Sequence, residues 1–566
     1  MGLNAALSMA KQSMEVFSTG IQVAGQNIAN AGTPGYIREN MVLNPSDPYR
    51  QGALVNGTGV EISGIQQQID QFLETRIHSA NTEYSSINER DTIYKQLESE
   101  LRELSGGDLS SGLNDFLSKL NNAVNQPSSI PDREFVISEA DKFASEINSL
   151  RQRINDLRTT QSVNVENTVK EANELIDKIV DLNPKISKLE ASGLLQSDAG
   201  ALRTQRYEAL NRLSELIPVR YREREDGAID VFTGSDYLVL AGSSQKLTLD
   251  TDTDRGVVTQ QVFLSRTNSN ISRTGGELKG IIEGRDDILG GFVDQLDSYA
   301  SNLIFEFNKI HASGEGTAGF EQLTSASAAL DPSATLNSTQ SGLPFQATHG
   351  SFQIKVTNKS TGITNTTTIN VDLDGIGADT TLNSLSSALN GVANLNSSVS
   401  TDGRLNISAN SDYEFRFSND TSGALAAIGI NTLFTGSDSS DIGINSVVKD
   451  NQQFLALGQG GGPSDGSNAV ALAAFSQQPI DQLGGISLDD YYDKVVSNIA
   501  QSSASEGALS EGAQTFRDSL MNQREQFSGV SIDEETINVL KFQRAFQSAA
   551  RLVSTVDELY TILLQI

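Results

Sequence analysis

The sequence predicts a multidomain α+β protein with three nested parts: a terminal α-helical coiled-coil pair, a helix bundle with β segments, and an inserted β-rich outer domain. Its 566 residues are several times the roughly 150 of a typical domain. Apolar residues recur at helical spacing at both ends and through much of the interior. From about residue 315 to 450, in contrast, Ser, Thr, Asn and Gly dominate, and apolar and polar residues alternate as they do in strands.

The N-terminal segment carries an apolar seam whose members are alternately four and three residues apart. This is the heptad spacing of a coiled-coil helix. Ala10 and Ala24 also lie on the seam, and their small side chains allow a partner helix to approach closely. The seam residues that we expect to make assembly contacts are Leu3, Leu7, Met14, Phe17, Ile21 and Ile28.

The C-terminal segment carries a second apolar stripe, whose expected assembly residues are Phe542, Leu552, Val556, Leu559 and Leu563. A further line of apolar residues at intervals of seven makes this stripe wider than a two-helix seam requires, so we expect the helix to touch more than one neighbour. Ordering the backbone costs about 1–2 kcal/mol per residue in conformational entropy. The few apolar side chains that two isolated helices bury against each other offset only part of this cost. We therefore expect both ends to be largely disordered in the monomer and to fold against neighbouring subunits.

A sharp turn is predicted where the first helix ends. The turn motif comprises Asn27, Asn30, Gly32, Pro34, Gly35 and Tyr36. Asn30 or Gly32 is suited to the left-handed conformation that closes a helix. Pro34 and Gly35 suit the central positions of a type II turn, after which the chain should continue in an extended conformation.

Three long interior helices are predicted from apolar spacing, over residues 77–104, 135–189 and 280–311. Pro184 is expected to kink or break the second helix near Asn183. Alternating segments predict strands over residues 219–224, 228–233, 237–241 and 257–264, and in the outer domain over 351–357, 366–372, 404–409 and 413–417, with a helix over 382–395. The regular alternation favours a folded outer domain over a disordered linker.

The expected domains follow from this nesting. Residues 1–50 and 525–566 form the terminal coiled-coil domain, residues 51–340 and 451–524 form the helix bundle with its β segments, and residues 341–450 form the inserted outer domain.

The composition argues against most binding and catalytic chemistry. Asp and Glu outnumber Lys and Arg by 71 to 41, which opposes nucleic-acid binding. The chain has no Cys and three scattered His, so thiolate and His-rich metal sites are not expected.

Residues 250–254 imitate the start of an EF-hand, but Arg255 replaces its glycine, and we interpret the segment as a solvated turn. The Gly-rich segment 458–466 lacks the ending of a phosphate-binding loop. We expect no enzyme activity, no cofactor, no bound metal and no membrane insertion.

Two segments carry a resemblance to a known family. The run Asn27–Tyr36 resembles the motif shared by bacterial flagellar rod, hook and hook-associated proteins. The run Ser528–Gln547, together with Gly275–Gly280, resembles the flagellar hook-associated protein 1 family, whose members form the hook–filament junction. Together the similar segments cover the termini and the middle of the chain.

The resemblance implies a structural, extracellular protein of the flagellum that is exported through the type III channel without a cleaved signal peptide. It implies self-association into an axial layer, contacts with the hook protein and a second hook–filament junction protein, and binding by a flagellar export chaperone. One alternative is another axial subunit, a hook or distal rod protein. Another is a surface adhesin or enzyme carried on a flagellar scaffold.

Overall fold

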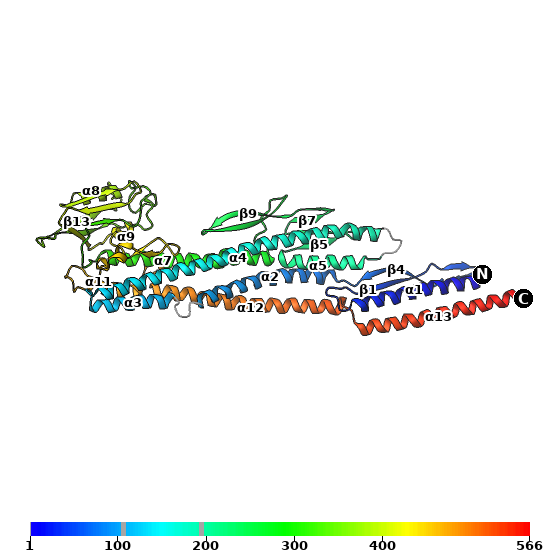
Figure 1. The fold of residues 1–566 in the computed structure, drawn as a ribbon. Helices are drawn as coiled ribbons and strands as arrows, with labels where there is room; N and C mark the ends of the chain where they lie inside the picture. The colour runs from blue at the N-terminus through cyan, green and yellow to red at the C-terminus, as the bar shows by residue number, and fades with distance from the viewer. Residues whose placement is uncertain (1, 103–108, 192–196, 566) are drawn as a thin grey trace. The chain divides into compact units, whose positions relative to one another are not determined.

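The computed structural model describes residues 2–102, 109–191 and 197–565, which form two compact units (Figure 1). The first comprises Met1–Ile93, Thr159–Arg285 and Ala504–Ile566, and the second comprises Tyr94–Arg158 and Asp286–Ser503. Three long helices contribute residues to both units: α2 (Gln71–Arg102), α4 (Ile130–Ala191) and α12 (Leu488–Ser528). The end of the first expected helix, at residues 103 and 104, lies outside the described residues.

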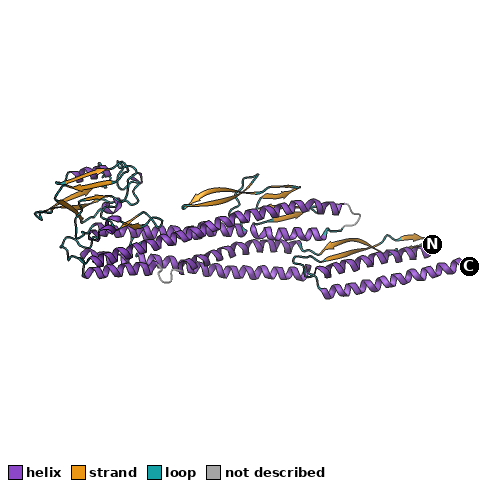
Figure 2. Ribbon diagram, viewed as in Figure 1, coloured by secondary structure: helices purple, strands orange, loops and turns teal. Residues whose placement is uncertain are grey.

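The first unit combines the terminal helices with an antiparallel β region (Figure 2). Its further helices are α1 (Gly2–Asn30), α5 (Gly200–Leu216), α6 (Gly276–Glu283) and α13 (Ile532–Gln565). Its strands are β1 (Glu39–Pro45), β2 (Tyr49–Gln51), β3 (Leu54–Asn56), β4 (Val60–Gln67), β5 (Arg220–Glu223), β6 (Ile229–Thr233), β7 (Asp236–Leu240), β8 (Ser243–Ser244), β9 (Leu247–Asp254) and β10 (Val257–Leu264). β1 pairs with β4, β2 with β3 and β9 with β10, and the fourth sheet has the order β5-β6-β7-β8.

The core of this unit lies between the end of α4, helices α5 and α6, and the strands β5 to β10. Ile176, Leu210, Val231 and Ile281 are buried there. The expected break at Pro184 does not occur, because α4 continues through this residue. The side chain of Asn183 donates to the carbonyl of Ile229 and accepts from its N–H, and this attachment to β6 holds the helix where the proline removes a backbone bond.

The second unit carries short helices and the outer sheets. Its helices are α3 (Leu109–Asn125), α7 (Gly290–Ala312), α8 (Leu382–Asn390), α9 (Ala424–Ile428), α10 (Ser446–Asp450) and α11 (Ser467–Ala473); a π-helical turn, Gly284–Leu289, connects α6 to α7. Its strands are β11 (Gln322–Thr324), β12 (Gly350–Asn358), β13 (Thr364–Val371), β14 (Leu395–Val399), β15 (Leu405–Ala409), β16 (Tyr413–Ser418), β17 (Phe434–Thr435) and β18 (Gly443–Ile444). The sheet orders are β13-β12-β16, β11-β15-β14 and β17-β18.

Aromatic side chains fill the core of the second unit. The ring of Phe307 contacts those of Phe116, Phe434 and Phe475, with centroids 5.2–5.7 Å apart. Beside this cluster, the fully buried His311 places Nδ1 2.8 Å from the carbonyl of Asn431 and accepts the N–H of Ala456 at Nε2. Burial lowers the pKa of His311 to about 4, so the ring is neutral and serves a structural role.

Three sequence-based expectations differ from the structure. Residues 250–254 belong to strand β9 and are not a turn, because pairing with β10 overrides the low strand propensity of aspartate. Helix α8 ends at Asn390, well before residue 395, because Leu395 begins β14. Strand β11 pairs with β15, so the outer β-rich part of the chain starts before residue 341.

Candidate assembly interface

The two terminal helices pack against each other in antiparallel directions (Figure 1). Near the chain ends, the hydroxyl of Tyr560 donates to Oδ1 of Asn4. Further along, the ring of Phe542 lies against Gly20. A Cβ at Gly20 would lie 2.9 Å from two ring carbons of Phe542, so the close approach depends on glycine. The expected pairing of the two ends is present in the first unit. The expectation that both ends are largely disordered in the monomer is not met, because a single copy already packs α1 against α13 and against β1 and β4.

On α1 the buried face is displaced from the predicted seam. The small seam residues Ala10 and Ala24 are buried, but Leu7 is exposed, and Leu3, Met14, Phe17, Ile21 and Ile28 are only half-buried. The fully buried residues are Ala10, Val16, Gly20, Val23, Ala24 and Asn27. The reason is that α1 packs on strands β1 and β4 as well as on α13. The heptad pattern carried no sign of this second partner.

On α13 the apolar stripe is divided between a buried and an exposed part. Ala549 and Val556 are 8% and 3% exposed, whereas Leu552, Leu559 and Leu563 are 38%, 45% and 62% exposed. Ile562 and, on α1, Leu7 are also exposed. We call these five exposed side chains the terminal apolar face: Leu7, Leu552, Leu559, Ile562 and Leu563. Within the described residues of one copy, no further element covers this face.

Asn27 is the centre of the turn motif. Its Nδ2 donates to the carbonyl of Glu39 at 2.9 Å, and its Oδ1 accepts from the hydroxyl of Tyr36 at 3.0 Å and from the N–H of Glu39 at 3.1 Å. Burial, reinforced by Glu39 and Glu535, raises the pKa of Tyr36 far above its usual value, so the hydroxyl keeps the proton that it donates. One amide thus fixes the end of α1 to the start of β1.

The turn itself follows the expected chemistry in one place and departs from it in another. Gly35 has φ of +73°, and the N–H of Tyr36 donates to the carbonyl of Thr33, as in a type II turn. The prediction of a left-handed residue at Asn30 or Gly32 is wrong, because neither has positive φ. Instead, α1 closes with a bond from the N–H of Ala31 to the carbonyl of Ile28, and Nδ2 of Asn30 donates to the carbonyl of Gln26.

Arg38 ties this turn to the start of α13. The guanidinium of Arg38 contacts Glu534 at 3.0 Å and Glu535 at 2.5 Å. The backbone N–H of Arg38 donates to the carbonyl of Ser528. Glu535 is buried, so this ion pair is shielded from solvent. The two adjacent acids therefore anchor the C-terminal helix to the N-terminal turn. Sequence spacing alone could not have joined residues that lie almost 500 positions apart.

The Gly-rich segment binds its own carboxylate. Oδ2 of Asp465 accepts the N–H groups of Gln459 and Gly461 at 2.7 and 2.8 Å, and Oδ1 accepts both the N–H and the hydroxyl of Ser467. These bonds hold the pKa of Asp465 well below its usual value. The carboxylate thus already engages the backbone N–H donors of this loop, and the loop has a structural role.

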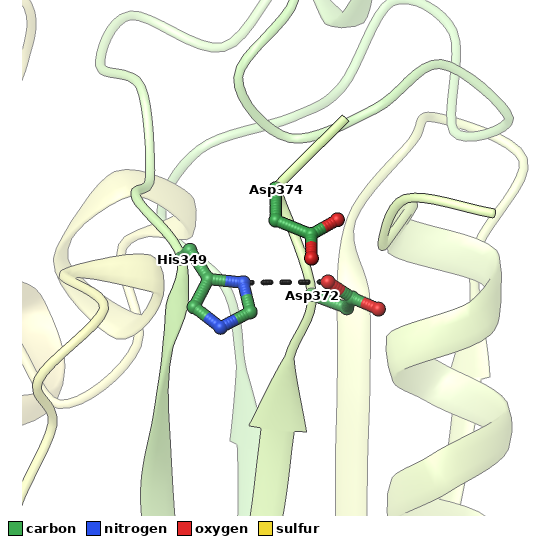
Figure 3. A group of neighbouring side chains, drawn as sticks. All are labelled: His349, Asp372 and Asp374. Atoms are coloured by element: carbon green, nitrogen blue, oxygen red, sulfur yellow. Dashed lines mark ion pairs between the residues drawn. The ribbon is translucent and has the colours of Figure 1, made fainter. Parts of the chain in front are cut away.

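His349, Asp372 and Asp374 lie within 4.8 Å of one another by their nearest possible ligand atoms (Figure 3). Nδ1 of His349 lies 3.3 Å from Oδ1 of Asp372 and also accepts the N–H of Leu373. Because that N–H uses the lone pair of Nδ1, the atom nearest the carboxylates is not available as a ligand. These contacts stabilise the turn that follows β13.

None of the helices in the described ranges combines length with enough apolar character to traverse a bilayer.

Comparison with known proteins gives consistent matches. The family model for the helical domain of flagellar hook-associated protein FlgK matches residues 94–323, and that for the C-terminal region of flagellar basal body rod FlgEFG proteins matches residues 521–566. Flagellar hook-associated protein 1 of Escherichia coli (strain K12) is 22% identical over 579 residues, covering 100% of both chains. The protein of the same name from Bacillus subtilis (strain 168) is 21% identical, covering 98% of this chain and 96% of that protein.

The structure of the flagellar hook junction protein FlgK from Burkholderia pseudomallei is 15% identical, with a TM-score of 0.49, and covers 81% of this chain and 100% of that chain. The curated relatives align from end to end and the helical-domain model matches the middle of the sequence, so the chain is similar over its whole length to flagellar hook-associated protein 1.

Proposed function

We propose that this chain is a structural, extracellular protein of the bacterial flagellum that joins the hook to the filament and assembles through its two terminal helices. The observation that carries the proposed mode of assembly is the terminal apolar face, where Leu559 and Leu563 are 45% and 62% exposed beside a contact already made within one copy. Large apolar side chains exposed together on one helix are typical of protein–protein contacts.

The size of the face suits a cooperative layer better than an isolated pair. Burying a fully exposed leucine contributes about 1.5–3 kcal/mol, so five side chains that are about half exposed contribute roughly 5 kcal/mol in all. That gain falls short of a stable dimer in dilute solution, because association itself costs free energy. In a layer each copy contacts several neighbours at once, and the contributions combine.

The expected partners are other copies of this chain, the hook protein, a second hook–filament junction protein and a flagellar export chaperone. The exposed leucines of α13 are the kind of surface that a chaperone covers before assembly. A hook or distal rod subunit is the alternative, but the rod-protein match is confined to residues 521–566, whereas the match to the hook-associated helical domain spans residues 94–323.

Deleting the gene and restoring it with variants tests this function. Cells without the gene should form hooks and shed filament protein into the medium, and the wild-type gene should restore attached filaments. Leu559→Asp should fail to restore them because it places a charge in the subunit contact. Leu330→Asp is the matched control, since Leu330 is 87% exposed in the second unit. Attached filaments in the deletion strain would refute the function, and normal filaments with Leu559→Asp would refute the assigned contact.

A further inference from the structure

Strand β5 and the residue that follows it carry three arginines at alternate positions. Arg220, Arg222 and Arg224 alternate with Tyr221 and Glu223 along the chain, and all three are exposed. β5 is an edge strand, with β6 as its neighbour in the sheet. Arg222 contacts Asp230 at 3.3 Å but keeps a side chain that is 74% exposed, and Arg224 contacts Asp226. We call Arg220, Arg222 and Arg224 the basic row.

Strand β9 presents three aspartates with the same alternation. Asp250, Asp252 and Asp254 share one face of the strand, Asp250 and Asp252 are exposed, and Asp254 contacts Arg255. β9 pairs with β10 in a two-stranded sheet, so among the described residues its other edge has no partner strand. We call Asp250, Asp252 and Asp254 the acidic row.

The two rows match in spacing and oppose in charge. Residues two apart on a strand are about 6.5–7 Å apart, so the charges of both rows repeat at the same interval. Opposite charges that face each other across neighbouring strands stabilise their pairing. In one copy the two rows belong to separate sheets, because β5 lies in the four-stranded sheet and β9 pairs with β10. Figure 1 shows β9 and β5 at separate places along the β region of the first unit.

We propose that neighbouring copies in the assembled layer contact each other laterally, with the basic row of one copy against the acidic row of the next. This inference rests on the proposed function, because it specifies a contact inside the layer. Each copy carries both rows at different places, so the contact is head-to-tail and repeats from copy to copy, as a ring or a helical layer requires.

The net charge of the chain supports a second copy as the partner of the basic row. A formal charge of −30 makes two copies repel each other at most approaches. The basic row places three exposed arginines at alternate positions, although Glu223, Glu225 and Asp226 are close to them in sequence. The acidic row of a second copy matches the basic row in length and is opposite in sign. The Debye length in physiological salt is about 8 Å, so charges farther apart than this contribute little. Charge pairs at such an exposed contact therefore act at short range and set the orientation and register of the two copies.

The absence of cysteine from the sequence allows a direct test. Arg222 and Asp252 are the central members of their rows, so they approach each other whichever way the strands run. Cells that lack the wild-type gene should produce Arg222→Cys and Asp252→Cys chains together, and isolated hook–filament structures should be oxidised. We expect a disulfide-linked dimer at least tenfold more abundant than in cells with either variant alone. Thr251→Cys replaces Asp252→Cys in the control, because Thr251 is exposed on the opposite face of β9.

Charge reversal gives a second measurement. Reversing the basic row alone (Arg220→Glu, Arg222→Glu and Arg224→Glu), or the acidic row alone (all three Asp→Arg), should lower the fraction of cells with attached filaments at least tenfold. Reversing both rows in one chain should restore that fraction to within twofold of wild type. Attached filaments with either row reversed, or cross-linking no stronger than the Thr251→Cys control, would overturn the lateral contact. Attached filaments with either row reversed would not contradict the proposed junction function, because they would show that the layer still forms.

Discussion

Replacing Gly20 by alanine should loosen the packing of α1 on α13, although the same substitution at Gly25 should strengthen α1. Both glycines lie inside the same helix. A Cβ at Gly25 meets no atom within 4 Å, whereas a Cβ at Gly20 meets the ring of Phe542 at 2.9 Å. The pair of variants therefore separates helix propensity from interhelical contact.

The expected magnitudes follow from these two environments. Gly→Ala in an exposed helix interior stabilises by about 0.5–1 kcal/mol, which is the whole effect expected at Gly25. The variant at Gly20 gains the same propensity but overpacks the contact, at a cost of about 1–3 kcal/mol. The two variants should thus differ by about 1–3 kcal/mol, which corresponds to roughly a fivefold to hundredfold difference in an opening equilibrium.

Hydrogen exchange of the backbone amides around Phe542 measures this opening. Gly20→Ala should accelerate exchange in α13 at least fivefold relative to Gly25→Ala, with no change in the second unit. Equal exchange in the two variants would refute the assigned contact between Gly20 and Phe542. It would show that α1 does not pack on α13 at this position in the free chain.

Three further outcomes are expected. Asn27→Ala should destabilise the turn by about 1–3 kcal/mol, because it leaves the buried partners of its amide unpaired; faster exchange of the Glu39 amide is the readout, and unchanged exchange would contradict the role of Asn27. For His311, whose pKa falls from 6.5 to about 4, the unfolded chain takes up a proton between those values that the native state does not, so stability falls by up to about 3 kcal/mol as pH drops through this window. A nuclear magnetic resonance titration that shows its ring charging near pH 6.5 would refute this assignment. Asp465→Ala should speed limited proteolysis within residues 458–466 several-fold, because three backbone N–H groups lose their acceptor; Asp465→Asn keeps one oxygen and should have a smaller effect.

Local signals in the sequence predicted most of the secondary structure. The Pro34–Gly35 pair and the alternation around residues 351–357 and 413–417 correspond to a turn and to strands β12 and β16, because these patterns act over a few residues. β9 was missed because its aspartates have low strand propensity, and only the partner strand β10 makes an extended conformation favourable. Pro184 was expected to kink or break α4, but the helix does not end there, and Asn183 attaches it to β6.

The candidate interface could be predicted only in part, for a related reason. The wide stripe on α13 indicated more than one neighbour, and the exposed leucines beside the contact with α1 agree with that pattern. The buried face of α1 depends on β1 and β4 as well as on α13, and a heptad pattern carries no information about strands. The contacts of Arg38 with Glu534 and Glu535 join opposite ends of the chain, so no local pattern could indicate them.

The accessibility of residue 559 in the free and assembled protein tests the central claim most directly. Leu559→Cys gives a single thiol in a chain that has no other cysteine. If α13 uses the terminal apolar face between subunits, a maleimide should label this thiol readily in the dilute monomer and at least tenfold more slowly in isolated hook–filament structures. Val556→Cys, at a position 3% exposed within the helix pair, is the buried reference. Equal labelling of residue 559 in the two states would contradict assembly through this face.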